Sequence, residues 1–286
     1  MPKRFEIMRK KVLTPEISSI SVYAPLIAAK AKAGEFIILR TDKDGERIPL
    51  TISSHDKDTV TVVFQKAGAG TIDLDALGEG DCLQDFAGPL GKPTPIKKYE
   101  GRVAVLGGGL GCAIALPVAK ALHDAGNTVD LIGGFKTKHL IILEDEMKEA
   151  STNLYICTDD GTFGFAGFVT NQLEALIKAG NKYDQVFAIG PLPMMKFASL
   201  LAAKYDLPIM VSMSPLMIDG TGMCGCCRVT VGGEIKFACV DGPDFDGHKI
   251  DFDEAIARNK SYKDFEAREK AQEEHVCRLT GGVRHA

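Results

Sequence analysis

The feature that most constrains the fold is an alternation of strand and helix that begins at residue 102. Apolar, β-branched strands end in glycine or polar turns, and an amphipathic helix follows each of them. The expected strands read RVAVLGG, VDLIGGF, NLYICTDDG, QVFAIGP and PIMVSMS, and the helices between them read CAIALPVAKALHDAG, LEDEMKEA, FVTNQLEALIKAG and PMMKFASLLAAKYD. This alternation is typical of a doubly wound sheet of parallel strands. Residues 99–213 are therefore predicted to form an α/β domain.

The residues before this alternation predict a different architecture. Five short segments, FEIMRKKVLT, SSISVYA, EFIILRT, IPLTISS and TVTVVFQK, are rich in β-branched residues and are separated by Gly, Asp or Pro. Their regular spacing favours a small closed barrel of antiparallel strands in residues 1–98. The segment IDLDALGEGD predicts a short helix that ends at Gly78. The segment GPLGKPTPIKKYEG, with Pro89, Pro93 and Pro95, predicts a linker.

Charge and hydropathy argue against several classes of partner. The formal net charge is -4, and 25% of the residues are charged, so neither nucleic acid nor an anionic membrane is an expected partner. The sequence contains no apolar run of about 18 residues, which a membrane-spanning helix would need. The N-terminus, MPKRFEIMRKKVL, lacks the apolar stretch of a signal peptide. We therefore expect a cytoplasmic protein.

The eight cysteines are distributed unevenly, because Cys224, Cys226, Cys227 and Cys239 fall in one short stretch. Structural disulfides are uncommon in the cytoplasm, so metal binding is the leading explanation. A [2Fe–2S] cluster needs four ligands, and plant-type clusters use C-x4-C-x2-C followed by a distant Cys. Cys224 and Cys227 match the close pair, and Cys239 matches the distant ligand. Five positions before Cys224 stands Asp219, whose carboxylate is the predicted fourth ligand.

Other interpretations of this stretch stay open. Cys226 rivals Asp219 as the fourth ligand, although its neighbour Cys227 makes joint ligation along an extended loop awkward. An Asp followed by Gly is also a common turn sequence. Zinc is the competing metal, since Cys224 and Cys227 have the spacing of half a zinc site, but a second pair is missing. Residues 214–286 are therefore predicted to form a small cluster-binding region with a charged helical tail.

Two motifs of the barrel region suit a flavin diphosphate. Arg47 lies beside a strand, where a guanidinium can pair with phosphate. The turn GAGT, which contains Gly70 and Thr71, opens a helix whose first N–H groups are free to bind phosphate. Thr51 and Ser53 can form hydrogen bonds with a flavin ring or ribityl chain. Each motif alone fits a surface charge or an ordinary turn, and their order and separation favour the flavin.

A second set of motifs suits a nicotinamide nucleotide. Gly108, Gly109 and Gly111 follow a strand and open a helix, which is the context of a pyrophosphate-binding turn, although the strict G-x-G-x-x-G pattern is not met. The turns TDDG and GPLPMM also follow strands, so we expect both at the carboxyl edge of the sheet, where ligands bind. The second strand lacks the usual terminal acid and is followed by Lys136 and Lys138. The preference between NADH and NADPH therefore stays open.

Together the motifs RIPLTIS, GAGT, GGGLGCA, TDDGTFGFAGFVT and AIGPLPMMK resemble the ferredoxin-reductase superfamily. Nearly the whole chain is similar to two of its members. One is the electron-transfer subunit of dihydroorotate dehydrogenase. The other is the small (alpha) subunit of NADH-dependent ferredoxin:NADP oxidoreductase, also known as a sulfide dehydrogenase subunit. The dihydroorotate dehydrogenase subunit normally has Cys at the position of Asp219. The tail from FDGHKIDF to EEHVCRL looks like that of the ferredoxin:NADP oxidoreductase subunit, so the resemblance to that subunit is favoured.

The resemblance implies three sites. FAD would be bound by Arg47, Pro49, Leu50, Thr51, Ser53, Gly70 and Thr71. NAD(H) would be bound by Gly108, Gly109, Gly111, Asp160, Gly190 and Pro191. The [2Fe–2S] cluster would be held by Asp219, Cys224, Cys227 and Cys239.

The resemblance also implies a role. NADH would transfer a hydride to FAD, and FAD would exchange single electrons with the cluster. The cluster would connect the chain to a larger flavin and [4Fe–4S] subunit, which handles NADP and ferredoxin by electron bifurcation. Two rival hypotheses are electron donation to a dihydroorotate dehydrogenase and a redox sensor or binding module that holds the cofactors without turnover.

Overall fold

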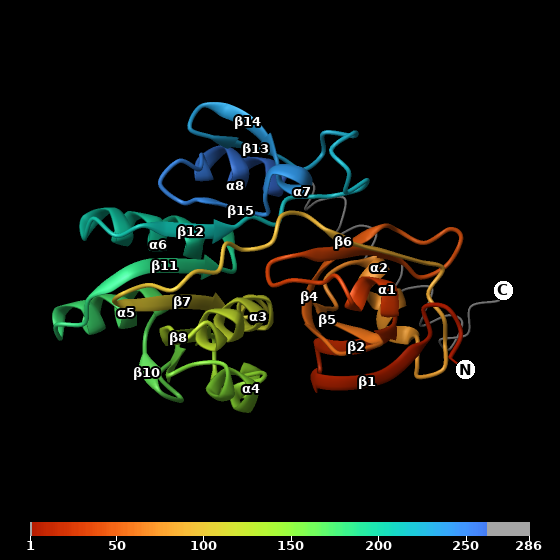
Figure 1. Ribbon diagram of the computed structural model, residues 1–286, viewed down its shortest axis with the longest axis horizontal. Helices are drawn as coiled ribbons and strands as arrows, with labels where there is room; N and C mark the ends of the chain where they lie inside the picture. The colour runs from red at the N-terminus through yellow and green to blue at the C-terminus, as the bar shows by residue number, and fades with distance from the viewer. Residues whose placement is uncertain (1, 262–286) are drawn as a thin grey trace.

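The computed structural model describes residues 2–261, and the rest of the predicted helical tail lies outside the described residues. Figure 1 shows a barrel built from the N-terminal segments (red to orange), a layered α/β part (yellow to teal) and a small C-terminal part (blue). The predicted combination of an antiparallel barrel with a doubly wound α/β domain is confirmed. None of the helices within residues 2–261 is long and apolar enough to cross a membrane.

The N-terminal part is a six-stranded antiparallel sheet with the strand order β1-β2-β5-β4-β3-β6. Its strands are β1 (Ile7–Thr14), β2 (Ile17–Tyr23), β3 (Phe36–Arg40), β4 (Ile48–His55), β5 (Thr59–Gln65) and β6 (Asp85–Leu90), and its helices are α1 (Pro25–Ala28) and α2 (Ala69–Ala76). The Ile7 N–H donates to the Asp81 carbonyl just before β6, so the two ends of the sheet meet. Ile20, Val22 and Phe64 are fully buried inside, as alternation in a small barrel requires.

Strand β6 lies partly in the segment that the sequence predicts as a linker. Gly88 and Pro89 fall within it, and both residue types are depleted in strands. β6 is the last strand of the sheet and pairs only with β3. A proline, which cannot donate a backbone hydrogen bond, is tolerated at such an edge. The linker prediction is therefore wrong for these residues, and the linker begins after Leu90.

The central part is a seven-stranded sheet in the order β10-β9-β8-β7-β11-β12-β15. Its strands are β7 (Arg102–Gly108), β8 (Thr128–Phe135), β9 (Asn153–Thr158), β10 (Phe165–Ala166), β11 (Tyr183–Ile189), β12 (Ile209–Ser212) and β15 (Asp244–Asp246), and its helices are α3 (Gly111–Asp124), the 3-10 helix η1 (Lys138–Leu140), α4 (Glu144–Glu149), α5 (Val169–Lys178) and α6 (Leu192–Lys204). All pairings except that of β15 are parallel. The chain reverses its direction of growth between β7 and β11, the position where ligands bind in such sheets.

The C-terminal part contains the hairpin β13 (Arg228–Val231) and β14 (Glu234–Phe237), then α7 (Ala238–Asp241) and α8 (Phe252–Lys260). The segment EIKFACV is a strand only as far as Phe237, because Cys239 lies on the helical turn α7. Strand β15 also comes from this segment, yet it pairs antiparallel with β12 as the edge of the central sheet. The domain boundaries after residues 98 and 213 stay a prediction.

A buried polar network lies at the amino ends of the central strands, opposite the ligand edge. The Asp130 carboxylate on β8 is fully buried and accepts hydrogen bonds from Arg102 on β7 at 3.0 Å, Asn153 on β9 at 2.7 Å and Tyr183 on β11 at 2.6 Å. Burial, followed by the hydrogen bond to Asp130, raises the pKa of Tyr183. One carboxylate therefore links four neighbouring strands.

Asp130→Asn is expected to lower the free energy of unfolding by about 2 kcal/mol, because it replaces charge-assisted hydrogen bonds in a buried network. Urea unfolding followed by circular dichroism measures this loss. Asp124→Asn on α3 is the matched control, since the exposed Asp124 carboxylate pairs only with Lys120 at 3.0 Å and its loss should cost at most about 0.5 kcal/mol. Equal losses in the two variants would contradict a role for the network in stability.

Candidate functional site

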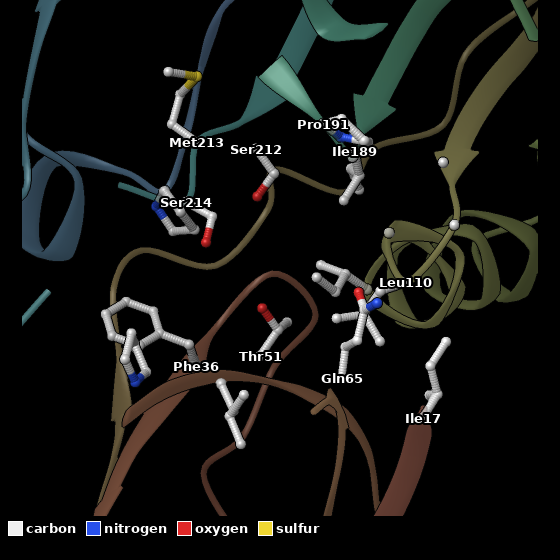
Figure 2. A pocket seen from close by; sticks show the side chains of 18 of the residues that line it. Ile17, Phe36, Thr51, Gln65, Leu110, Ile189, Pro191, Ser212, Met213 and Ser214 are labelled. Atoms are coloured by element: carbon white, nitrogen blue, oxygen red, sulfur yellow. The ribbon is translucent and has the colours of Figure 1, made fainter. Parts of the chain in front are cut away.

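A cavity of ≈ 440 Å³ lies between the barrel and the carboxyl edge of the central sheet, within the range of about 300–1,000 Å³ typical of ligand sites. The barrel lines it with Phe36, Pro49, Leu50, Thr51 and Gln65, the central sheet with Gly108, Gly109, Leu110, Gly111, Lys136, Ile189, Gly190 and Pro191, and the segment from the end of β12 with Ser212, Met213, Ser214 and Met217. Figure 2 shows Thr51 on one side and Ser212 and Ser214 on the other, with their hydroxyl groups directed toward the same space.

Two glycine turns meet at the reversal point of the sheet. A Cβ on Gly111 would lie 2.4 Å from the Ile189 carbonyl oxygen, and a Cβ on Gly190 would lie 3.1 Å from the Gly108 nitrogen. The β7–α3 and β11–α6 turns therefore pack backbone against backbone. Gly109 has φ +57 and a Cβ there would meet nothing within 4 Å, so the start of α3 is open to the cavity. Free N–H groups at a helix N-terminus favour a bound pyrophosphate.

The structure brings most of the predicted flavin and nucleotide residues to this one cavity. Those that line it are Pro49, Leu50, Thr51, Gly108, Gly109, Gly111, Gly190 and Pro191. Their contacts with a cofactor stay a prediction, but their gathering follows from two simple facts. β4 faces the sheet edge with its outer side, and the two glycine turns are neighbours at the reversal point.

Five predicted residues lie elsewhere, three of them outside the GAGT turn. The buried Ser53 hydroxyl donates to the Ala113 carbonyl oxygen at 3.0 Å and so fastens β4 to α3. Asp160 lies in an exposed turn after β9, where hydrogen bonds from Thr162 lower the pKa of its carboxyl. Arg47 is turned away from the cavity and contacts the C-terminal part. Binding of FAD or NAD(H) by these three residues stays a prediction.

The GAGT turn begins α2 as predicted but does not line the cavity. The Thr71 hydroxyl accepts hydrogen bonds from the Ala67 and Gly68 N–H groups at 3.0 and 3.1 Å, so it caps its own helix. A Cβ on Gly70 would lie 2.6 Å from a carboxylate oxygen of Glu46. An acidic side chain thus lies where the prediction puts phosphate, and the role of Gly70 and Thr71 in flavin binding stays a prediction.

The structure adds cavity residues that the sequence analysis missed. Ser212 ends the last parallel strand and Ser214 follows it, so the rule that ligands bind at carboxyl ends of strands could have identified them. Lys136 follows β8 and was noted only for nucleotide preference. Phe36 and Gln65 carry no local signal, because their exposure to the cavity depends on how the barrel closes and packs against the sheet.

Two of the predicted cluster ligands are in direct contact. The Cys227 and Cys239 sulfur atoms are 3.2 Å apart, and both residues are buried. Burial, followed by contact with Cys227, raises the pKa of the Cys239 thiol to about 12. In the absence of a metal the Cys239 thiol holds its proton, and iron would replace it, since thiolates are the ligands of iron–sulfur clusters.

The other two cysteines of the stretch form a second pair, in which Cys224 is exposed and Cys226 is half-buried. The Cys226 thiol is hydrogen-bonded to the Cys224 sulfur. The backbone N–H groups of Cys226 and Asp219 point at Cys224 and lower its pKa. N–H groups aimed at a sulfur are a feature of cluster-binding loops. Cys226 therefore lies close enough to Cys224 to stay a rival ligand.

Asp219 lies at the start of the same loop. Its Oδ2 accepts hydrogen bonds from the Thr221 hydroxyl at 2.5 Å, the Thr221 N–H at 2.9 Å and the Met223 N–H at 3.2 Å. The Thr221 bonds are the main cause that lowers the pKa of the Asp219 carboxyl. Asp219 can thus form the turn through Oδ2 and still bind iron through Oδ1, so the two interpretations are compatible.

Within residues 2–261, the structure contains no group of three or more His, Cys, Asp or Glu side chains gathered closely enough to hold a metal ion. The donors fit a [2Fe–2S] cluster in chemistry, because cysteine sulfur atoms and one carboxylate belong to the same C-terminal part of the chain. They form two pairs and not one cage, so the assignment of the four ligands stays a prediction.

Comparison with known proteins adds independent findings. Residues 214–251 match the family model described as the iron-sulfur cluster binding domain of dihydroorotate dehydrogenase B. This match confirms the predicted iron–sulfur region. A protein of Thermotoga maritima, named as a homolog of the dihydroorotate dehydrogenase B (NAD(+)) electron transfer subunit, is 41% identical over 278 residues, which cover 96% of each chain.

Solved structures agree with this relationship. A chain from the structure of an NADH-dependent reduced ferredoxin-NADP oxidoreductase, a flavin-based electron-bifurcating enzyme, is 40% identical, has a TM-score of 0.90, and aligns over 95% of this chain and 98% of its own length. The ferredoxin reductase of carbazole 1,9a-dioxygenase shares only 17% identity over 72% of this chain and 66% of its own, with a TM-score of 0.60, which shows the common fold. The chain therefore belongs to the family of dihydroorotate dehydrogenase B electron-transfer subunits and their homologues, within the ferredoxin-reductase superfamily.

Proposed function

We propose that the chain is the small subunit of an NADH-dependent ferredoxin:NADP oxidoreductase and carries electrons between NAD(H), FAD and a [2Fe–2S] cluster. The relative with 40% identity and a TM-score of 0.90 supports this choice. FAD, when bound, supplies the step between two-electron and one-electron chemistry. Cys224, Cys227, Cys239 and Asp219 would hold the cluster, with Oδ1 of Asp219 as the oxygen donor.

One observation carries the proposal: a single cavity is shared by all three parts of the chain. The same space is lined by Pro49, Leu50 and Thr51 of β4, by the glycine turns at the reversal point, and by Ser212, Met213, Ser214 and Met217. Residue 217 is only two positions from Asp219, where the cysteine loop begins. A flavin between barrel and sheet would therefore contact a nucleotide on one side and the approach to the cluster on the other.

The chain's own residues position the reactants. Thr51, Ser212 and Ser214 present hydroxyl groups to the cavity (Figure 2) and can orient a flavin by hydrogen bonds. The start of α3 offers its N–H groups and macrodipole to the nucleotide pyrophosphate. Phe36 and Met217 are buried apolar side chains at the cavity wall, so they exclude water from the space where hydride transfer takes place.

An electron-transfer subunit of this family acts with a larger partner subunit. For this chain we propose a flavin and [4Fe–4S] subunit that handles NADP and ferredoxin. The second candidate is a dihydroorotate dehydrogenase, favoured by the name of the relative that is 41% identical. Affinity purification of the tagged chain from its native host separates the two. Recovery of a partner that oxidises dihydroorotate would defeat the first proposal.

The proposal is tested on the purified chain by its absorption spectrum, EPR spectrum, flavin content and metal content. It requires one FAD and about two iron atoms per chain, and bleaching of the flavin on addition of NADH. Zinc in place of iron, or protein without flavin, would refute it. Flavin and iron without NADH-dependent dye reduction would instead support a sensor or binding module.

Thr51→Val is expected to weaken FAD binding about fivefold, which corresponds to about 1 kcal/mol for one lost hydrogen bond. Titration of the deflavinated protein with FAD measures the dissociation constant. Thr61→Val on β5 is the matched control, because the Thr61 hydroxyl bonds to Ser21 at 2.8 Å on the barrel and does not line the cavity. An unchanged dissociation constant in Thr51→Val would show that its hydroxyl does not bind the flavin.

A further inference from the structure

Arg47 links two parts of the chain that are far apart in sequence. It precedes β4, and its side chain extends to the segment before the cysteine loop. The Arg47 Nε–H donates to the Ile218 carbonyl oxygen at 2.6 Å, and Nη2 reaches the Asp219 carbonyl oxygen at 3.4 Å. A guanidinium that bridges two successive carbonyl groups fixes the direction of the backbone there, because its donors form a rigid planar fork.

The same segment is packed tightly against the barrel. Gly220 is buried, and a Cβ there would lie 2.6 Å from Cδ1 of Ile38 on β3 and 3.0 Å from Cδ1 of Leu90 on β6. Gly220 also has φ +82, a conformation in which only glycine is unstrained. The Gly220 backbone therefore packs directly against β3 and β6 of the barrel. Arg47, just before β4, binds the same segment through the Ile218 carbonyl group.

The position of Arg47 along β4 connects this contact with the cavity. Ile48 is buried within the barrel, whereas Pro49 and Thr51 line the cavity. Arg47 itself does not line the cavity, but it immediately precedes β4 and lies only two residues before Pro49. On the other side, Met217 lines the cavity one residue before the Ile218 carbonyl group that Arg47 binds.

We propose that Arg47 is a positioning residue that holds residues 217–219 at a fixed place between the flavin cavity and the [2Fe–2S] cluster. This inference rests on the proposed function. It assigns to Arg47 a role in the geometry of electron transfer in place of the flavin-diphosphate contact expected from the sequence. The Arg47 guanidinium also lies against the Asp219 backbone, with Nη2 3.4 Å from the carbonyl oxygen, so its positive charge would favour the more negative, reduced form of a cluster bound beside it.

Three substitutions separate the effect of charge from the effect of geometry. Arg47→Lys keeps the charge and loses the planar fork. Arg47→Gln loses the charge and keeps a single NH2 donor group, and Arg47→Ala loses both. Arg40→Ala is the matched control. Arg40 is a barrel arginine near Arg47 and pairs with Asp85 at 2.7 Å, not with the cysteine loop.

The experiment uses the full chain with its cofactors. Arg47→Ala should retain FAD and iron at the wild-type level. Electron transfer from NADH-reduced flavin to the cluster, followed by stopped-flow absorption, should slow by about tenfold or more, because small displacements of reacting groups have large effects on rate. The EPR signal of the reduced cluster should broaden. The cluster midpoint potential should fall in Arg47→Ala and Arg47→Gln but not in Arg47→Lys.

Three outcomes would overturn the inference. Loss of FAD from Arg47→Ala, with an unchanged EPR signal, would assign Arg47 to the flavin diphosphate. Wild-type rate, signal and potential in all three variants would show that the contact has no role. The flavin and cluster content of the wild-type chain tests the proposed function separately. If the wild-type chain lacked flavin or cluster, the proposed function itself would be refuted. Equal effects in Arg40→Ala would also overturn it, by attributing them to loss of any barrel arginine.

Discussion

Replacement of Cys227 by Ser is expected to abolish the cluster, reducing iron from about two atoms per chain to nearly none. The reason is geometric: its sulfur lies 3.2 Å from that of Cys239 in a buried pair, so the pair cannot hold iron when one thiolate is missing. Cys239→Ser should give the same result. Metal analysis and the EPR spectrum of the reduced protein measure it, while the flavin absorption should persist because the cavity is intact.

The neighbouring cysteine supplies a sharp control. Cys226→Ser changes the residue next to Cys227, so it tests whether any change in this loop is harmful. We expect it to retain iron, whereas Asp219→Ala should lose it. The reverse pattern would make Cys226 the fourth ligand. Full retention of the cluster in Cys227→Ser would refute the pair as ligands altogether.

Gly111→Ala is expected to lower kcat/KM for NADH by about 100-fold, since the added methyl group forces apart two turns at the nucleotide site. A Cβ at this position would lie 2.4 Å from the Ile189 carbonyl oxygen and 2.8 Å from the Gly190 Cα. Both are backbone atoms that cannot rotate away. Dye reduction at varied NADH concentration gives the ratio, and reduction of the bound flavin by dithionite shows that the rest of the path is intact.

Gly78→Ala is the matched glycine control, because the nearest atom to its added methyl group would be an Asp81 carboxylate oxygen at 3.7 Å. Its kinetics should equal those of the wild-type protein. If Gly111→Ala retained wild-type kcat/KM, the nucleotide would have to bind away from the start of α3. Thermal unfolding of both variants separates a local effect on the site from a general loss of stability.

The elements with strong periodicity could be predicted from the sequence because their signals are local. Every parallel strand from β7 to β12, except the two-residue β10, ends in a turn that the sequence marks with Gly or polar residues. Connectivity rules then limit the possible strand orders of the sheet to a few. β6 and β15 escaped prediction for the opposite reason. Pro89 makes β6 look like a loop, and the three residues of β15 become a strand only through pairing with β12.

In the candidate site, too, features with a local signal could be predicted, and features that depend on long-range packing could not. The glycine turns at Gly108 and Gly190 could be predicted to meet, because carboxyl ends of parallel strands share one edge. The direction of Arg47 could not be predicted. An arginine before a strand can bind a phosphate or a carbonyl group, and only the packing of residues 218–220 on the barrel decides between them. Ser53 likewise bonds to Ala113 because α3 lies against β4.

The edge strand β15 has a consequence for modularity. Its residues come after the cysteines, yet they complete the sheet that begins at residue 102, with Met210, Val211 and Ser212 each opposite a residue of β15. A shortened protein that stops at residue 213 would leave the backbone groups of β12 uncovered and prone to self-association. The iron-binding region is thus not an independent module. Evolution or engineering could exchange it only together with β15, the edge strand of the central sheet.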